Sequence, residues 1–249
     1  MAEPASLARL SDIERLYRLL DALSQCAGGA RMLADRGRFR DWPERGVYFF
    51  FEPSELRTDS GTGPRIVRVG THALSLRSRS TLVQRLNQHR GSLLGSGNHR
   101  GSIFRLLVGQ ALLTRGGLPI CPSWGMRGSA SDASACLGIN RATLIVAEAP
   151  VEQAVSAYLG TTQILWISVD DEPGPKSLRG FIERNVIGLL SNYGRSAIDA
   201  PSTNWLGYAT NRKRVVSSGL WNQRHVDETY DSRFLDTLEL LIARSVRLE

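Results

Sequence analysis

Two basic side chains on one predicted helix are the first residues in this sequence whose types and spacing suit chemistry. Arg85 and His89 lie four residues apart in a segment that Ser80 or Thr81 can cap and Gly91 can end, so both project from one face. A guanidinium group stabilises negative charge on a phosphate, and an imidazole carries a proton near neutral pH. The same pair also suits an exposed helix, because a basic residue such as His89 is favoured near a helix C-terminus.

Two β-prone segments directly precede this helix and have to position it. Val47–Phe51 and Arg65–Gly70 are joined by a link rich in Gly, Pro, Ser and Asp, which predicts a hairpin with a long loop. Tyr48 lies two residues into the first strand, where tyrosine is also common as a packing residue. Arg68 lies beside Gly70 in the second strand. It can bind a phosphate, but it cannot act as a base because arginine keeps its proton in proteins.

A second helix, predicted for Ser177–Ser191, carries a carboxylate at the edge of its apolar stripe. Glu183 lies at that border, where partial burial would remove water from the carboxylate. Alternatively, Glu183 forms a surface ion pair with Arg179, four residues earlier on the same helix face. Asn192 follows the helix, either as a cap of its C-terminus or as a polar group near a site.

In this order, the parts resemble the GIY-YIG nuclease superfamily. Gly46-Val47-Tyr48 stands where that family has Gly-Ile-Tyr, and Arg68-Val69-Gly70 stands where it has Tyr-Ile-Gly. Arg85 matches the helix arginine of the family, and His89 matches the histidine one turn later in its homing and restriction members. The sequence departs from the family at Arg68, where a second tyrosine is usual.

The resemblance covers roughly residues 45–192, apart from a large insertion, and it implies a role for each matching residue. It implies that Glu183 binds a single Mg²⁺ or Mn²⁺ ion and that Tyr48, or His89 acting with it, orients or deprotonates a water molecule. Arg85, with Arg68, would stabilise the phosphate in the transition state, and Asn192 would lie near the site. The implied activity is a divalent-metal-dependent endonuclease that hydrolyses DNA, with RNA left open as a substrate.

The charge of the chain is compatible with a nucleic-acid ligand. The 249 residues carry a net charge of +7, and almost all basic residues are arginine, with Lys176 and Lys213 as the lysines. Arginine-rich composition arises either from the base composition of a genome or from phosphate binding, because guanidinium groups match phosphate oxygens. The residues that we predict to contact the nucleic-acid backbone are Arg45, Arg77, Arg79, Arg90, His99 and Arg100. Arg36, Arg38 and Arg40 form either a solvated loop or a further phosphate-contacting edge.

The sequence also indicates where the protein works. No run of about eighteen apolar residues is present, which predicts no membrane span. The N-terminus lacks the long apolar segment of a secretory signal. Cys26, Cys121 and Cys136 are odd in number and far apart, so we expect reduced thiols in a cytoplasmic protein.

The predicted fold is α/β, with a small mixed sheet flanked by helices. We expect an N-terminal helical extension at 1–44, a core at 45–195 and a C-terminal extension at 196–249 that ends in a helix over Ser232–Arg247. The core is interrupted at about 91–140 by a long insertion, in which Ser102–Thr114 is helical and the rest has little regular structure. After the insertion, Ala142–Ala147 is predicted as a buried strand because of its apolar, β-branched composition.

Two other functions stay open at this point. The chain could be a nucleic-acid-binding module that keeps the fold and lacks catalysis, which the arginine at Arg68 would favour. It could also be a regulatory or structural subunit of a larger bacterial complex. We expect any homodimer or partner protein to bind through the insertion and the C-terminal helix.

Overall fold

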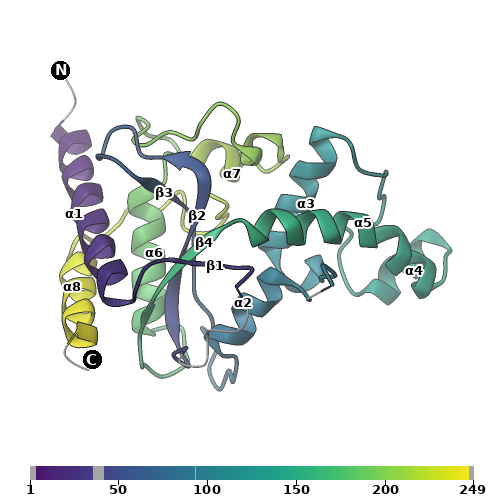
Figure 1. Ribbon diagram of the computed structural model, residues 1–249, viewed down its shortest axis with the longest axis horizontal. Helices are drawn as coiled ribbons and strands as arrows, with labels where there is room; N and C mark the ends of the chain where they lie inside the picture. Colours follow the sequence, from purple (N-terminus) through teal and green to yellow (C-terminus); the bar gives the residue numbers. More distant parts are fainter. Residues whose placement is uncertain (1–3, 36–41, 93, 247–249) are drawn as a thin grey trace.

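The computed structural model describes residues 4–35, 42–92 and 94–246, and its centre is a four-stranded sheet (Figure 1). Arg36, Arg38 and Arg40 lie outside the described residues. The strands are β1 (Arg31–Met32), β2 (Gly46–Leu56), β3 (Pro64–Gly70) and β4 (Gln163–Ser168), in the order β1-β4-β2-β3. Every pairing between these described strands is antiparallel, so the α/β class is confirmed while the sheet is not the mixed one that we predicted.

Alternation of side chains along β2 explains why helices cover both faces of the sheet. Val47 and Phe49 enter one hydrophobic core, whereas Tyr48 and Phe50 enter the other. This is the period of two that a strand imposes on its side chains. Because the neighbouring strands continue both apolar faces, the sheet is a central layer between two groups of helices.

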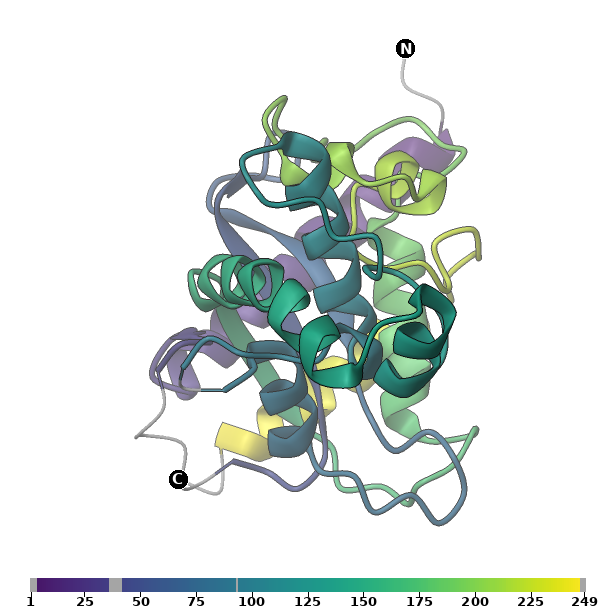
Figure 2. The ribbon, with the colours of Figure 1, turned by 90° about the vertical axis from the view of Figure 1, so that its right-hand side faces the viewer.

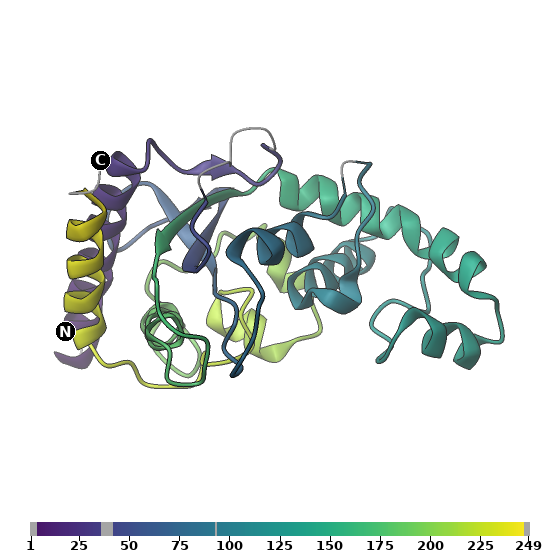
Figure 3. The ribbon, with the colours of Figure 1, turned by 90° about the horizontal axis from the view of Figure 1, so that it is seen from below.

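The first face is covered by α1 (Pro4–Cys26), α6 (Leu178–Leu190) and α8 (Arg233–Val246), as Figures 1 and 3 show. The predicted helices at these positions are confirmed. Arg9 of α1 caps the end of α6: its Nε donates to the carbonyl of Leu189 at 2.8 Å and its Nη2 to that of Ser191 at 2.8 Å. These bonds satisfy carbonyls that a helix end leaves unpaired. They also fix the position of α6, which carries Glu183.

The second face is covered by α2 (Leu82–Arg90), α3 (Ile103–Arg115) and the second half of α5 (Arg141–Gly160). Two short 3₁₀ turns, η1 (His99–Gly101) and η2 (Leu206–Ala209), and the short helix α7 (Lys213–Ser218) complete this side. Side chains from the predicted C-terminal extension, including Trp205 and Trp221, lie in this core and not on a separate unit. The boundaries of the three predicted segments stay a prediction.

A helical arm formed by α4 (Ala130–Leu137) and the first half of α5 extends from the body on the side opposite α1 and α8 (Figures 2 and 3). The predicted strand at Ala142–Ala147 is wrong, because this segment belongs to α5. The side chain of Asn140 accepts a hydrogen bond from the backbone of Thr143 and starts the helix. Only one side of this segment is buried, so its apolar run packs as a helix although its composition favours a strand.

A buried ion pair holds the end of α2 in place. Arg105 of α3 is fully buried and donates to Glu152 of α5 through Nε at 2.9 Å and Nη2 at 2.5 Å. Its Nη1 donates to the carbonyls of His89 at 2.9 Å and Arg90 at 3.1 Å. One side chain therefore connects three helices and satisfies the last carbonyls of the helix that carries Arg85.

We predict that replacing Arg105 destabilises the fold strongly. Arg105→Met leaves Glu152 buried without its guanidinium partner, and breaking a buried ion pair in this way typically costs about 3–5 kcal/mol. Arg233→Met is a matched control, because Arg233 forms an exposed pair with Asp231, and exposed ion pairs contribute little to stability. Urea unfolding of both variants measures the difference. Equal midpoints for the two variants would show that the buried pair does not stabilise the fold.

Candidate active site

A cleft of about 610 Å³ opens where the two motif strands, α2 and α6 meet. Its walls come from Arg68 and the loop after β3, from Arg85 on α2, and from Glu183 on α6. Residues 100–103 and the C-terminal segment 222–225 close the other sides. Segments that are far apart in the sequence therefore meet around one concave surface, which is the usual form of an active site.

The two motif glycines are required by close approaches of the chain. A Cβ on Gly46 would lie 2.5 Å from the backbone oxygen of Ile167, which lies on the neighbouring strand β4. A Cβ on Gly70 would lie 2.4 Å from both Cζ and the hydroxyl oxygen of Tyr48, the residue opposite Gly70 in the pairing of β2 with β3. The glycines thus allow the tyrosine ring to lie across the neighbouring strand.

Tyr48 and His89 form a buried hydrogen-bonded pair. The Tyr48 hydroxyl lies 2.9 Å from Nε2 of His89, and Nδ1 of His89 lies 2.8 Å from Oγ of Ser102. Burial lowers the pKa of His89 well below its usual value of 6.5, and Arg68 and Arg85 lower it further. The imidazole is therefore neutral at physiological pH and able to accept a proton.

The charge around Tyr48 favours its deprotonated form only in part. Burial raises the pKa of the phenol, while the nearby guanidinium groups of Arg85 and Arg68 oppose that rise. The phenol is thus neutral in the free protein, but a phenolate would have two cations beside it. Tyr48 itself is fully buried, and Arg68 and Arg85 line the cleft.

The side chain of Arg68, the residue that departs from the family pattern, is buried and bonded within the protein. Its Nη1 donates to the carbonyl of Trp221 at 2.8 Å, and its guanidinium lies 4.8 Å from the ring centroid of Phe104. Burial lowers the pKa of Arg68, and the charge of Arg85 lowers it further. Arg68 therefore contributes a fixed positive charge to the cleft where the family has a phenol.

Arg85 and Glu183 face the same cleft from different helices. Nη1 of Arg85 donates to Gln88 at 2.9 Å, and the side chain remains half-buried. Glu183 is also half-buried, and its predicted alternative partner Arg179 forms an ion pair with Asp171 instead, at 2.6 Å. Burial raises the pKa of Glu183, and the charges of Arg68 and His225 oppose the rise.

Glu183 has the properties of a ligand for one hard cation. It forms no salt bridge with any residue in the described part of the chain, and its carboxylate accepts a hydrogen bond from the backbone of Thr71, which leaves lone pairs for a cation. The described residues contain no group of three or more His, Cys, Asp or Glu side chains that could hold a metal ion. A Mg²⁺ ion keeps several water molecules and is commonly bound by one or two carboxylates together with substrate phosphates. The single carboxylate in the cleft therefore fits a cation that binds with its substrate.

Asn192 does not reach the cleft. Its side-chain oxygen accepts hydrogen bonds from Nη2 of Arg9 at 2.9 Å and from the backbone of Ile198 at 3.0 Å. Its amide donates to the carbonyl of Ile198 at 3.1 Å. The side chain thus fastens the segment after α6 to α1, and it has no place in the chemistry that we propose below.

Some of the residues predicted to contact nucleic acid are exposed, and others already bond to groups within the protein. Arg77 and Arg79 are exposed on the loop between β3 and α2. Arg45 is half-buried, with Nη1 donating to the carbonyl of Asp171 at 2.6 Å, and Arg90 is half-buried at the end of α2. Only the two loop arginines are therefore fully open to a ligand.

His99 and Arg100 are held by two glutamates of α5. His99 is buried, its Nδ1 lies 3.0 Å from Glu152, and its ring stacks on Trp124 at 3.9 Å between centroids. Arg100 donates through Nη1 and Nη2 to Glu148, both at 2.7 Å. These contacts connect the insertion to α5. Arg100 also lines the cleft, but with its charge already paired.

The C-terminal wall of the cleft could not be predicted from the sequence. Asn222 and His225 lie in an irregular, polar part of the sequence, where no periodic pattern marks them. The side-chain oxygen of Asn222 accepts a hydrogen bond from the backbone nitrogen of Val69 at 3.1 Å, and the side-chain nitrogen donates to the carbonyl of Val69 at 2.8 Å. This pairing is a long-range contact that only the folded chain reveals.

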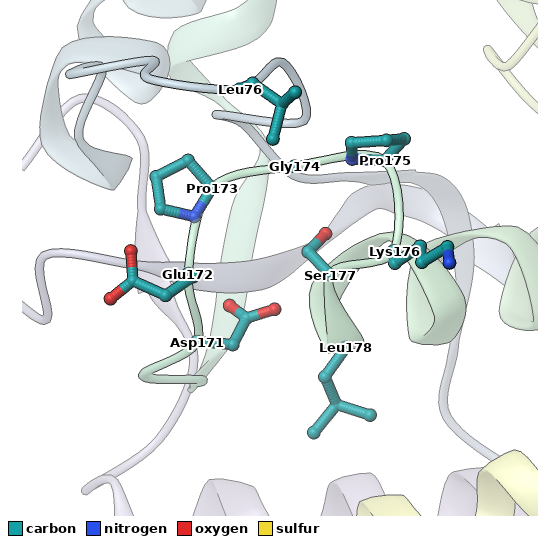
Figure 4. Close-up of a pocket in the computed structure, with 9 residues that line it drawn as sticks. All are labelled: Leu76, Asp171, Glu172, Pro173, Gly174, Pro175, Lys176, Ser177 and Leu178. Carbon is teal, nitrogen blue, oxygen red and sulfur yellow. The ribbon is translucent and has the colours of Figure 1, made fainter.

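A neighbouring pocket of about 590 Å³ is formed by the loop 171–178 and Leu76 (Figure 4). Leu76 lies across from Pro173, Gly174 and Pro175, so the lining is mainly apolar. Of its acidic residues, Asp171 is already paired with Arg179. Asp171 therefore stabilises the local structure of the loop, and the residues that line this pocket do not form a catalytic set of the kind found in the cleft.

Comparison with protein families assigns the chain to a family of nuclease-type enzymes. Residues 7–247 match the family described as the GIY-YIG domain, so the chain belongs to the GIY-YIG family. Searches of curated proteins and of solved structures found no match. None of the helices in the described residues combines the length and hydrophobicity that crossing a bilayer requires.

We predict that Gly70→Ala displaces Tyr48. The added methyl would overlap a buried ring that has no room to move, and overpacking of this kind typically costs about 1–3 kcal/mol. Gly160→Ala is the matched control, because its nearest neighbour, Cβ of Ala34, would lie at an ordinary 3.6 Å. Urea unfolding of both variants tests the prediction, which fails if Gly70→Ala unfolds at the same midpoint as the control.

We also predict that His89 makes the fold acid-sensitive. Its pKa in the folded protein lies well below 6.5, so below about pH 6.5 the unfolded chain binds a proton that the folded chain does not. Stability is therefore retained above that pH and lost on acidification, by at most about 1.4 kcal/mol per pH unit. Urea unfolding between about pH 7.5 and about pH 5.5 should show a steeper loss for the wild type than for His89→Gln. Parallel curves would contradict this.

Proposed function

We propose that this protein is a divalent-metal-dependent endonuclease that hydrolyses phosphodiester bonds in DNA. The observation that supports this most is the meeting of Arg85 and Glu183 in one cleft, together with the buried Tyr48–His89 pair, on which Arg85 acts electrostatically. These are the four kinds of group that the reaction requires: a phosphate-binding cation, a ligand for a metal ion, and a hydroxyl with a proton acceptor behind it. Membership of the GIY-YIG family supports the same chemistry.

The substrate phosphate would bind between the two cleft arginines. Arg68 and Arg85 present positive charge to the cleft, while Arg77 and Arg79 extend that charge along the exposed loop beside it. Guanidinium groups in a partly desolvated site stabilise the charge that develops on a phosphate during the attack. The arginines would therefore serve first in binding and then in transition-state stabilisation.

The proton of the attacking water would pass to the buried pair. As the oxygen of Tyr48 takes a proton from water, its own proton would move to Nε2 of the neutral His89, 2.9 Å away. Arg68 and Arg85 line the cleft whereas Tyr48 is fully buried, so we infer that a phosphate engages these guanidinium groups before water reaches Tyr48. Ser102 would keep the imidazole oriented through Nδ1.

Glu183 would hold the metal ion at the opposite wall of the cleft. A bound Mg²⁺ or Mn²⁺ supplies positive charge that neutralises the phosphate as its ester bond breaks. The role of the chain is to present one partly buried carboxylate near the phosphate, with Arg68 nearby to keep it ionised.

We predict that plasmid cleavage depends on Glu183 and on Arg85. Supercoiled DNA is incubated with each protein and with Mg²⁺ or Mn²⁺, and nicked and linear products are measured. Glu183→Gln and Arg85→Ala should each lower the rate by about 10²-fold or more, as loss of a transition-state contact does. Glu172→Gln is the matched carboxylate control and should cleave as the wild type does, because Glu172 is exposed outside the cleft.

The outcomes separate the possible functions. Cleavage that persists in both variants would assign the activity to a different site or a contaminant. If the wild type binds DNA in a salt-dependent manner but cuts it with neither metal, the protein is a binding module, and Arg68 is the residue that distinguishes it from active relatives. Weak, salt-insensitive binding would point to a regulatory or structural subunit.

A further inference from the structure

The C-terminal segment that closes the cleft is attached to the edge of β3. The backbone nitrogen of Trp221 donates to the carbonyl of Val67 at 2.8 Å, and the Trp221 carbonyl accepts Nη1 of Arg68 at 2.8 Å. Asn222 continues the attachment through its two bonds to Val69. The segment thus follows the motif strand, and the position of the residues just after it is fixed relative to the site.

His225 occupies this wall in a conformation that needs support. Its φ is +65°, in the left-handed region that residues other than glycine enter at an energetic cost. Nδ1 of His225 donates to Oε1 of Glu228 at 2.8 Å, which fixes the orientation of the ring. The side chain is 22% exposed and lines the cleft, so the ring is accessible to a ligand. Strained residues of this kind occur most often at functional sites.

His225 and Glu183 line the same cleft. His225 comes from the C-terminal segment, whereas Tyr48 and His89 come from β2 and α2 and are fully buried. In an in-line displacement the attacking water and the leaving oxygen are on opposite sides of the phosphorus atom. The buried Tyr48–His89 pair can serve only one of these sides, so the leaving oxygen calls for a separate proton donor that lines the cleft, as His225 does.

We propose that His225 is a further catalytic residue, which protonates the ester oxygen that leaves the phosphorus atom. The inference rests on the proposed nuclease function. As the water oxygen bonds to phosphorus, the bond from phosphorus to the ester oxygen breaks, and the proton on Nε2 of His225 moves to that oxygen. The imidazole is left neutral and regains a proton from solvent. Glu228 is a positioning residue that keeps Nε2 directed into the cleft.

The test compares two leaving groups. The wild-type products first show which ester oxygen leaves, and a DNA duplex is then prepared with sulfur in place of that oxygen, because a thiolate leaves without a proton. His225→Asn is the main variant, since asparagine tolerates a left-handed backbone, and His225→Gln is the second. Both should cleave normal DNA about 10²-fold more slowly or worse. On the sulfur-containing DNA both should come within about threefold of the wild type, because general-acid assistance is no longer needed.

Controls address folding and the metal ion. Glu228→Gln should show the same pattern with a smaller loss, and Arg233→Gln, at an exposed position, should behave as the wild type does on both substrates. Circular dichroism and thermal unfolding establish that each variant is folded. An equal loss on both substrates, or recovery of normal cleavage at raised Mg²⁺ or Mn²⁺, would overturn the role of His225 while the nuclease function stands. Failure of the wild type to cleave either substrate would overturn both proposals.

Discussion

The contact between the ring of Tyr48 and the backbone at Gly70 is the constraint on which the rest of the site depends. The register of β2 with β3 places these residues opposite each other, and no side chain other than hydrogen fits beneath the ring. The hydroxyl is thereby directed toward His89 on α2. The position of α2 then has to match, and Arg105 secures it by bonding to its final carbonyls. A single steric requirement in the sheet thus determines where the helix residues stand.

Arg68 shows how a departure from a family motif can be absorbed by the surrounding structure. A buried guanidinium needs hydrogen-bond acceptors and a compatible surface, and here it has the carbonyl of Trp221 and the face of Phe104. Both partners lie outside the motif strands, on the C-terminal segment and α3. Burial raises the pKa of both Glu183 and Tyr48, and the charge of Arg68 opposes that rise. An arginine here therefore favours the ionised forms of the groups that the proposed reaction uses.

The local parts of this arrangement were predictable from sequence, and the long-range parts were not. The hairpin, the helix of Arg85 and the helix of Glu183 follow from short-range periodicity and capping, and the structure confirms them. Ala142–Ala147 was misassigned because β-branched composition favours a strand, whereas one-sided burial decided for a helix. His99 carries the polarity of a site residue, but Glu152 and Trp124 hold it in the interior. The pairing of Asn222 with Val69 spans more than half the chain and leaves no local pattern.

That last pairing changes what the site consists of. The strands that carry Tyr48 and Arg68 form only part of the cleft, because Asn222 and Trp221 complete the free edge of β3 and bring His225 beside Glu183. At the other end of the chain, Arg9 caps the helix that presents Glu183. Both ends therefore position groups in or beside the cleft, which agrees with a family match that extends over residues 7–247. Segments outside the motifs therefore hold the site residues in position, and the geometry of the cleft depends on contacts from both ends of the chain.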